Sequence, residues 1–243
     1  MLPEAVILSG GPATRLRPIT HKVPKGMVGV AGEPFIAHQL RLLKSKGISR
    51  VLILAGYLGG QIKDFVKDGS AFGIEAHYSF DGEKLLGTGG AVKKAFGMMG
   101  DPFFLMYGDS YLDTEYKQIY EYFLKQGKPA LMAVFKNNDR WDKSNIEYKD
   151  GMITGYDKVN PAGRMEYIDY GLSLIRKEAF AGREYPQVFG IDRLYQDLIS
   201  EGKLAAYEVK ERFFEIGSLK GLEEADKYLR GISRAKEEGE RDG

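Results

Sequence analysis

The chain has 243 residues, a formal net charge of +1, and a hydrophobic fraction of 43%. This composition supports a full core, and the balanced charge argues against a dedicated nucleic-acid or membrane-surface binder. The absence of cysteine excludes disulfides, thiolate metal sites and a cysteine nucleophile. No apolar run approaches the ~18 residues of a membrane span and no leader-like segment precedes the first strand, so a soluble cytoplasmic protein is expected.

Short apolar runs alternate with amphipathic segments through the first half of the chain. The runs predict buried strands at 5–9, 51–55, 74–78 and 103–107. Helical spacing of apolar residues predicts helices at 34–46, 60–67 and 88–99. Repeated β–α units of this length predict a Rossmann-like α/β fold, in which helices flank a mostly parallel central sheet.

The second half is less regular. Its patterns predict strands at 130–135, 146–148, 152–157, 168–175 and 204–209, and helices at 191–200 and 219–229. No internal repeat and no linker divides the chain, so residues 1–230 are expected to form a single domain. The highly charged segment 233–243 predicts a frayed tail with partial helix.

The strongest chemical signal is the loop after the first strand, which reads GGPATRLRP and is followed by Pro24-Lys25. In open α/β sheets, ligands bind beyond the carboxyl ends of the strands, where glycines let backbone N–H groups approach a phosphate or a base. Arg15 offers a planar fork for phosphate oxygens and Lys25 a compact charge. The loop has neither the Walker A lysine nor the dinucleotide glycine spacing. The alternative is an ordinary surface loop with solvated cations.

This segment resembles the nucleotidyltransferase signature Gly-Gly-x-Gly-Thr-Arg-Leu-x-Pro-x-Thr followed by Pro-Lys, with Ala13 in place of the third glycine. The resemblance implies a magnesium-dependent sugar-1-phosphate nucleotidyltransferase, which joins a nucleoside triphosphate to a sugar 1-phosphate and releases pyrophosphate. It implies that Arg15 grips the triphosphate and that Lys25 stabilises charge on the α-phosphate. Further nucleotide contacts are expected from Leu8, Ser9, Gly10, Gly11 and Thr14.

The resemblance extends through nearly the whole chain. The segment LGTGGA at 86–91 looks like the family's base-recognition segment, which implies base contacts from Gly87 and Thr88. Asp81 stands where family members read the base edge, and a carboxylate there suits the two adjacent donors of guanine. The alternatives are a plain glycine-rich helix cap and an acid that faces water.

Two acidic residues are candidates for binding Mg²⁺. Asp109 follows the strand FFLMY beside Gly108, and an acid at a strand's carboxyl end is well placed to hold Mg²⁺ on phosphate oxygens. It resembles the family's metal aspartate, although a helix N-cap is the alternative. Glu215 lies in a segment that resembles the second metal segment, where the acid is usually aspartate. Direct ligation, a water-bridged contact and an exposed glutamate all remain open.

Further segments resemble the family's sugar pocket. Asp157 and Lys158 look like its acid–lysine pair, in which the lysine holds the sugar's phosphate and the acid a hydroxyl. The resemblance also implies sugar-phosphate contacts from Gly108, Asn145, Tyr170 and Gly171. The alternatives are a surface ion pair at 157–158 and a core tyrosine at 170.

These assignments divide the expected domain into a nucleotide-binding half (1–128) and a sugar-phosphate half (129–230), followed by a charged tail (231–243). The chain resembles heptose-1-phosphate guanylyltransferases, which favours a GTP-using heptose- or mannose-type enzyme. A uridylyltransferase for a hexose or N-acetylmuramate 1-phosphate, a phosphocholine-type cytidylyltransferase, and a non-catalytic nucleotide-sugar-sensing subunit are the alternatives. No nucleic-acid or membrane partner is expected, and a homo-oligomer remains open.

Overall fold

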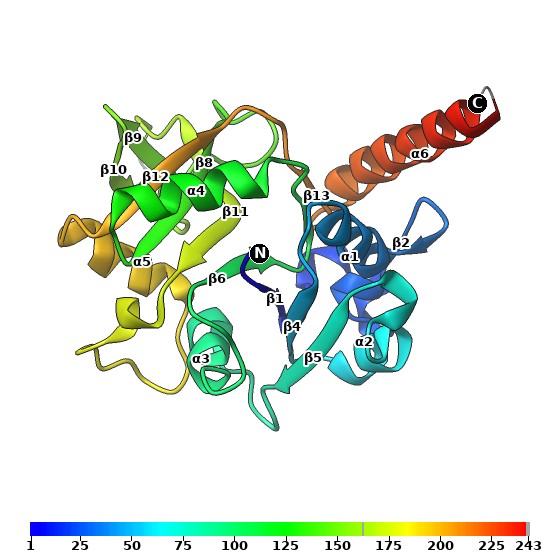
Figure 1. The fold of residues 1–243 in the computed structure, drawn as a ribbon, viewed down its shortest axis with the longest axis horizontal. Helices are drawn as coiled ribbons and strands as arrows, with labels where there is room; N and C mark the ends of the chain where they lie inside the picture. Colours follow the sequence, from blue (N-terminus) through cyan, green and yellow to red (C-terminus); the bar gives the residue numbers. More distant parts are fainter. Residues whose placement is uncertain (162, 242–243) are drawn as a thin grey trace.

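The computed structural model describes residues 1–161 and 163–241, and its centre is a nine-stranded mixed sheet (Figure 1). The N-terminal part of this sheet is parallel. Strand β1 (Ala5–Ser9) lies between β4 (Arg50–Ala55) and β6 (Phe103–Tyr107), and β5 (Glu75–Phe80) pairs with β4 on the outside. Strands β1, β4 and β6 are nearly continuous apolar runs, as expected for strands whose two faces are covered by helices, whereas β5 is mixed in polarity. The predicted α/β fold class is confirmed.

The C-terminal part of the sheet is mixed. Strand β11 (Tyr167–Ile175) runs antiparallel to both β6 and β8 (Ala130–Lys136), and β12 (Leu204–Val209) continues the sheet parallel to β8. The hairpin of β9 (Ile146–Lys149) and β10 (Met152–Tyr156) joins β11 at Tyr167. Two small ribbons pair β2 (Gly29–Val30) with β3 (Glu33–Pro34), and β7 (Ser110–Tyr111) with β13 (Phe214–Glu215).

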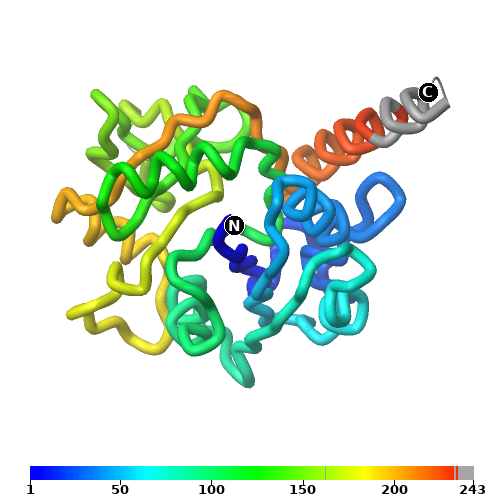
Figure 2. The backbone as a smooth tube through the Cα atoms, viewed as in Figure 1, coloured from blue at the N-terminus to red at the C-terminus, as the bar shows by residue number. Residues whose placement is uncertain are grey.

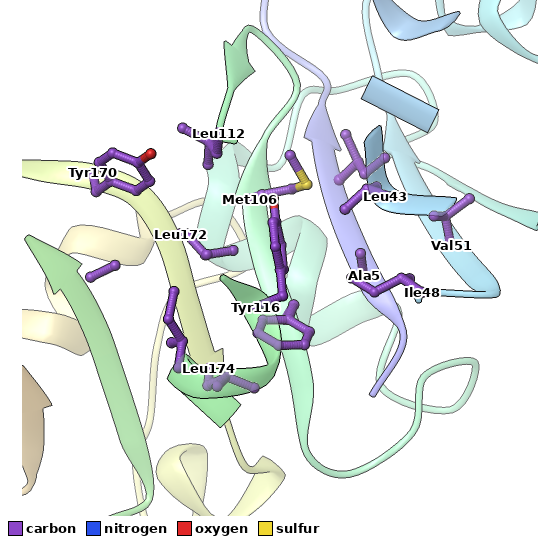
Figure 3. Packing of buried hydrophobic residues seen from close by; sticks show 14 of the residues in the cluster. Ala5, Leu43, Ile48, Val51, Met106, Leu112, Tyr116, Tyr170, Leu172 and Leu174 are labelled. Atoms are coloured by element: carbon purple, nitrogen blue, oxygen red, sulfur yellow. The ribbon is translucent and has the colours of Figure 1, made fainter. Parts of the chain in front are cut away.

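Alternate residues of the central strands build two hydrophobic layers. Ile7 joins the layer under α1 (Phe35–Ser45), α2 (Gly59–Val66) and α4 (Tyr116–Gln126), whereas Val6 joins the layer under α3 (Gly87–Lys94) and α5 (Ile191–Ser200). Figure 3 shows the first layer, where side chains from neighbouring strands meet Leu43 and Tyr116 from the covering helices. Short 3₁₀ turns complete the elements at Thr14–Leu16, Ile19–His21, Lys25–Met27, Ser70–Phe72 and Lys177–Phe180.

The helices differ from the sequence predictions in three places. Helix α4 is missing from the predictions, although its buried residues Tyr116, Ile119 and Phe123 have helical spacing. Helix α3 ends at Lys94 rather than at residue 99, because a turn follows it. Helix α6 (Leu219–Arg241) leads away from the rest of the molecule (Figure 2). It extends to residue 241, so residues 233–241 of the expected tail are helical throughout rather than only in part. Residues 242–243 of the expected tail lie outside the described residues.

None of the helices in the described ranges combines the length and the apolar composition needed to cross a bilayer.

The first layer predicts a large stability loss when Phe104 is truncated. This ring is 0% exposed and packs edge-on against Tyr116, with 5.4 Å between ring centroids. Phe104→Ala should lower the free energy of unfolding by about 3–5 kcal/mol, because the lost burial adds to the cost of a cavity. Urea denaturation measures this change. The control Met152→Ala, at a side chain 57% exposed, should stay within about 0.5 kcal/mol. Equal urea midpoints for Phe104→Ala and Met152→Ala would contradict the inference that the Phe104 ring is tightly packed in the core.

Candidate active site

Two adjoining cavities open at the carboxyl ends of β1 and β6. The first has a volume of about 300 Å³ and the second of about 540 Å³, and Tyr107 and Asp109 line both. The first cavity is lined by Leu8, Ser9, Gly10, Gly11, Pro12, Ala13, Lys25, Gly26, Leu54, Asp81, Leu85, Gly87, Thr88, Ala91, Tyr107, Gly108 and Asp109. The second is lined by Arg15, Tyr107, Asp109, Ser110, Asp142, Lys143, Asn145, Lys158, Ile168, Asp169, Tyr170, Gly171, Phe213 and Glu215.

Carbonyl groups of the loop after β1 accept hydrogen bonds that hold the loop in place. The Gly10 carbonyl accepts a hydrogen bond from the Tyr57 N–H at 3.0 Å, and the Ala13 carbonyl accepts one from the Thr20 hydroxyl at 2.8 Å. Ala13 has a left-handed conformation with φ 48° and ψ 50°, which costs a non-glycine residue about 1–2 kcal/mol. Ala13 therefore holds, with local strain, a conformation that a glycine adopts without steric cost.

Lys25 and Asp109 meet at the boundary between the cavities. The Lys25 Nζ donates to Asp109 Oδ2 at 2.7 Å, although 84 positions separate the two residues along the chain. Burial opposes the ionisation of Asp109, yet the neighbouring Lys25 ammonium and the Ser110 hydroxyl hold the pKa of this carboxyl below its usual value. Arg15 lies in the second cavity with Asp109, so the three predicted residues converge. The Arg15 side chain is 61% exposed and its guanidinium lies 3.9 Å from Asp142.

Glu215 reaches the same place from the other end of the chain. Strand β13 pairs with β7, and the Ile216 N–H donates to the Asp109 carbonyl at 2.9 Å. The Glu215 carboxylate accepts hydrogen bonds from the Gly217 N–H and from the Ser218 hydroxyl. Burial, and then the negative charge of Asp109, raise the pKa of Glu215. Two carboxylates therefore face one cavity and destabilise each other's charge.

This donor set fits a magnesium ion that is bound together with a phosphate. In the described part of the chain, no group of three or more His, Cys, Asp or Glu residues is arranged to hold a metal by itself. Mg²⁺ usually takes only one or two protein carboxylates and completes its shell with phosphate oxygens and water. Asp109 and Glu215 supply those two carboxylates, and a divalent cation would relieve their mutual repulsion.

The far end of the first cavity is apolar and holds one acid. Asp81 follows β5 among Leu54, Leu85 and Ala91, and its Oδ2 accepts the Leu86 N–H at 3.1 Å. Burial raises the pKa of Asp81. A carboxylate in such a pocket is suited to accept hydrogen bonds from the edge of a flat ring.

The glycines at the start of α3 pack closely against residues 187–191, and Gly87 and Thr88 also line the first cavity. Gly87 has a left-handed φ of +71°, and the Gly89 N–H donates to the Phe189 carbonyl at 2.9 Å. A side chain at Gly89 would collide with the ring of Phe189, and one at Gly90 with the carbonyl of Gln187. The Thr88 hydroxyl accepts the Ile191 N–H at 2.8 Å, at the start of α5. Close packing against residues 187–191, rather than approach to a ligand, explains the small residues after Gly87.

Most of the predicted residues line one of the two cavities. Thr14 and Asp157 line neither cavity. The Asp157 carboxylate instead accepts the N–H groups of Val159 and Asn160 at 2.8 and 2.9 Å, which closes a turn. Gly108, expected beside the sugar phosphate, lines the first cavity rather than the second. Tyr170 is 1% exposed, so it belongs mainly to the core and only touches the second cavity.

Several side chains of the second cavity are not among the predicted site residues, and they include Tyr107, Asp142 and Asp169. Lys158 pairs with Asp169, at 2.8 Å between Nζ and Oδ2, and not with the adjacent Asp157. One signal was available: Asp169 is an acid inside an apolar strand, and such residues are rarely buried unless they are paired.

The chain belongs to the nucleotidyl transferase family, whose family model matches residues 4–145. It is an enzyme, a nucleotidyltransferase, which confirms the resemblance seen in the loop after β1. The D-glycero-alpha-D-manno-heptose 1-phosphate guanylyltransferase of Campylobacter jejuni is 29% identical over 215 residues, which are 88% of this chain and 94% of that protein. The N-acetylmuramate alpha-1-phosphate uridylyltransferase of Neisseria meningitidis is 35% identical over 119 residues, or 49% of this chain and 52% of that protein.

A solved structure shares the fold. The crystal structure of HddC from Yersinia pseudotuberculosis complexed with GMP-PN matches with a TM-score of 0.79 and 22% sequence identity, covering 94% of this chain and 100% of that chain.

The tight packing beneath Asp109 predicts that Gly108→Ala impairs transfer. The new methyl group would collide with the Ser9 hydroxyl and lie 2.8 Å from the Leu8 carbonyl oxygen, so we expect the backbone next to Asp109 to shift. A displacement of about 1 Å in such a site lowers turnover by roughly 10²-fold. Steady-state nucleotidyl transfer measures the loss.

Two matched variants test the cause. Gly60→Ala places its methyl group where no atom lies within 4 Å, and it should keep the wild-type rate. Adding Ser9→Ala to Gly108→Ala removes one of the two collisions and should restore the rate only in part. A wild-type rate for Gly108→Ala alone would show that the strand end tolerates the methyl group.

Proposed function

We propose that the protein is a sugar-1-phosphate nucleotidyltransferase, which joins a nucleoside triphosphate to a sugar 1-phosphate and releases pyrophosphate. The observation that carries this proposal is the Lys25–Asp109 pair at the boundary between two cavities. The first cavity has an apolar end that suits a base, and the second contains Arg15 and Lys158, which suit phosphates. Residues 1–128 supply most of the nucleotide side and residues 129–230 most of the sugar side.

The reaction needs no general base and no covalent intermediate, because the sugar's phosphate oxygen is already an anion. Its barrier comes from repulsion between two polyanions and from charge that builds up around the α-phosphorus, and fixed cations aimed at those oxygens lower it. Lys158 would hold the incoming phosphate. Arg15 and Lys25 would neutralise the triphosphate and the departing pyrophosphate. We expect in-line attack with inversion at phosphorus.

Asp109 and Glu215 would hold Mg²⁺ in this site. When bound, the ion supplies positive charge next to the α-phosphate oxygens. Without it, Lys25 neutralises Asp109, whereas burial and the charge of Asp109 raise the pKa of Glu215.

We propose GTP as the nucleotide and a heptose- or mannose-type 1-phosphate as the acceptor. Two observations support this choice. Guanine presents two adjacent donors that the Asp81 carboxylate is placed to accept, and uracil presents only one. The Campylobacter jejuni relative, which this chain matches over 94% of that protein's length, is named a heptose 1-phosphate guanylyltransferase. A uridylyltransferase, and a cytidylyltransferase for a phosphocholine-type acceptor, are the outcomes that the substrate tests below would reveal.

Removing either member of the central pair should abolish most of the turnover. Asp109→Asn and Lys25→Ala are each expected to lower kcat by at least ~10²-fold, because Lys25 supplies a fixed positive charge to the α-phosphate and Asp109 would hold both Lys25 and the Mg²⁺. Pyrophosphate release measures the rate, with and without Mg²⁺, and the urea midpoint shows that the fold survives. The control is Asp113→Asn, whose carboxylate pairs with Lys46 at 2.8 Å outside both cavities. Near-normal turnover in either test variant would refute the role of that residue.

Asp81→Asn should reduce the use of GTP more than that of ITP. A hydrogen bond to a charged group contributes about 1.5–3 kcal/mol, so losing the contact to the 2-amino group should cost about 10- to 100-fold in kcat/KM for GTP. ITP lacks that amino group and should lose less. The control Asp64→Asn changes an exposed acid on α2 and should affect neither nucleotide.

The assay compares GTP, ITP, UTP, CTP and dTTP with a panel of sugar 1-phosphates and with choline phosphate. Preferred use of UTP or dTTP by the unmodified protein would contradict the proposed guanine specificity. Turnover on choline phosphate with CTP would assign the protein to the cytidylyltransferases.

A further inference from the structure

The second cavity contains a buried acid that the proposed reaction does not use directly. Asp169 lies on β11, and only 2% of its side chain is exposed. Its Oδ2 accepts hydrogen bonds from Lys158 Nζ at 2.8 Å, from the Tyr156 hydroxyl at 3.0 Å and from the Tyr107 hydroxyl at 3.2 Å. Its Oδ1 accepts the Gly171 N–H at 2.9 Å. This carboxylate is therefore satisfied by protein donors and has little capacity left for a ligand.

The same contacts fix the lysine. An ammonium has three N–H donors. Lys158 uses one on Asp169 and a second on the Tyr107 oxygen, at 2.7 Å. The ammonium also lies 4.4 Å from the centroid of the Tyr107 ring. Among the described residues no partner takes the third N–H, and the Lys158 side chain is 37% exposed. A flexible side chain is thus held with one donor left for the cavity.

The hydrogen bonds among Tyr107, Lys158 and Asp169 also connect β6, which leads to Asp109, with β10 and β11. Tyr107 is the last residue of β6, two positions before Asp109, whereas Asp169 is on β11 and Lys158 follows β10. The main chain reinforces the connection, because the Asp169 N–H donates to the Asn145 side-chain oxygen at 2.9 Å. The position of Lys158 relative to Asp109 is therefore set through Tyr107 and Asp169.

We propose that Asp169 is a positioning residue, which holds Lys158 with a single N–H directed at the acceptor's phosphate and sets it against the strand end that bears Asp109. This inference rests on the proposed function, in which Lys158 binds the phosphate of the sugar. Asp169 contacts no substrate itself. Its effect is carried by Lys158, so it should appear in the binding of the sugar phosphate and not in that of the nucleotide.

The pKa of Lys158 is a second, independent quantity by which the proposal can be tested. Burial works against the charged form of Lys158, yet the charge of Asp169 and the Tyr107 oxygen raise the pKa of the lysine well above its ordinary value. The groups that face this ammonium are Tyr107 from β6, Tyr156 from β10 and Asp169 from β11, and Tyr195 from α5 stands behind Tyr156. Asp169 is the charged member of this set. Without its charge, burial dominates and the pKa of Lys158 must fall.

The test variant is Asp169→Asn, which keeps the size of the side chain and removes its charge. The KM for the sugar 1-phosphate should rise by about tenfold or more, the loss expected for a hydrogen bond to a charged group, while the KM for the nucleotide stays within about twofold. Loss of an opposite charge shifts a pKa by about 1–3 units, so the basic limb of the rate profile should move down by at least about one pH unit. A deprotonated lysine no longer attracts the phosphate, which sets the direction of this shift.

Two further variants distinguish a positioning role of Asp169 from a packing role. Tyr107→Phe removes a hydroxyl but leaves the charge of Asp169, so it should raise the KM for the sugar 1-phosphate with a smaller shift of the basic limb than Asp169→Asn causes. Glu147→Gln removes a carboxylate that pairs with Arg164 at 2.9 Å outside both cavities, and it should change neither quantity. If Asp169→Asn raises both KM values equally and leaves the pH profile in place, Asp169 is only a packing residue and the proposal fails.

A direct measurement keeps this inference separate from the proposed function. The ¹³Cε resonance of Lys158, assigned by its loss in Lys158→Met, reports the protonation of this one side chain without any turnover. It should titrate at lower pH in Asp169→Asn than in the unmodified protein. An unchanged titration would overturn the positioning role. The expected shift together with no turnover on any sugar 1-phosphate would instead retain the role and refute the proposed function.

Discussion

The contact between Lys25 and Asp109 is the interaction on which the rest of the site depends. Strands β1 and β6 are parallel neighbours, so the segments that follow them open at the same edge of the sheet. Each side chain is only about one quarter or less exposed, at 21% and 25%, and a charge in such a place is costly unless it is paired. The pair therefore keeps two opposite charges fixed at the boundary of the cavities before any ligand arrives, and such preorganisation is what phosphoryl chemistry requires.

The second cavity repeats this arrangement with Lys158 and Asp169. In both pairs a lysine is held by an acid from another strand end, so neither cation is free to follow a ligand by moving its side chain. Arg15 differs, because it is 61% exposed and its contact with Asp142 is long, at 3.9 Å. Fixed lysines suit the atoms between which a bond forms, whereas a mobile arginine suits a leaving group that must depart. The net charge of the whole chain gives no indication of this local pairing of lysines with acids.

Much of the fold and part of the site follow from local patterns in the sequence. The buried strands are continuous apolar runs, and the glycine-rich loop marks the edge where ligands bind. The acid inside an apolar strand indicates that Asp169 is paired, but its partners do not follow from local patterns because they come from separate segments. The resemblance to the family's acid–lysine pair indicates Asp157 together with Lys158, whereas in the structure Lys158 pairs with Asp169, because neighbours in an extended segment point to opposite sides. Helix α4 was missed because its aromatic residues give a weak helical propensity, and tertiary packing decides its structure.

Each of the two cavities depends on residues from both halves of the chain. Residues 187–191 back the first cavity, because Phe189 fills the space left by Gly89 and Thr88 binds the N–H that begins α5. In the opposite direction, Arg15 from the loop after β1 lines the second cavity. Helix α5 thus begins at residues that back the first cavity and packs through Tyr195 against Tyr156 of β10. A substitution that widens one cavity must move elements that define the other, so we expect base and sugar specificity to be coupled in this protein.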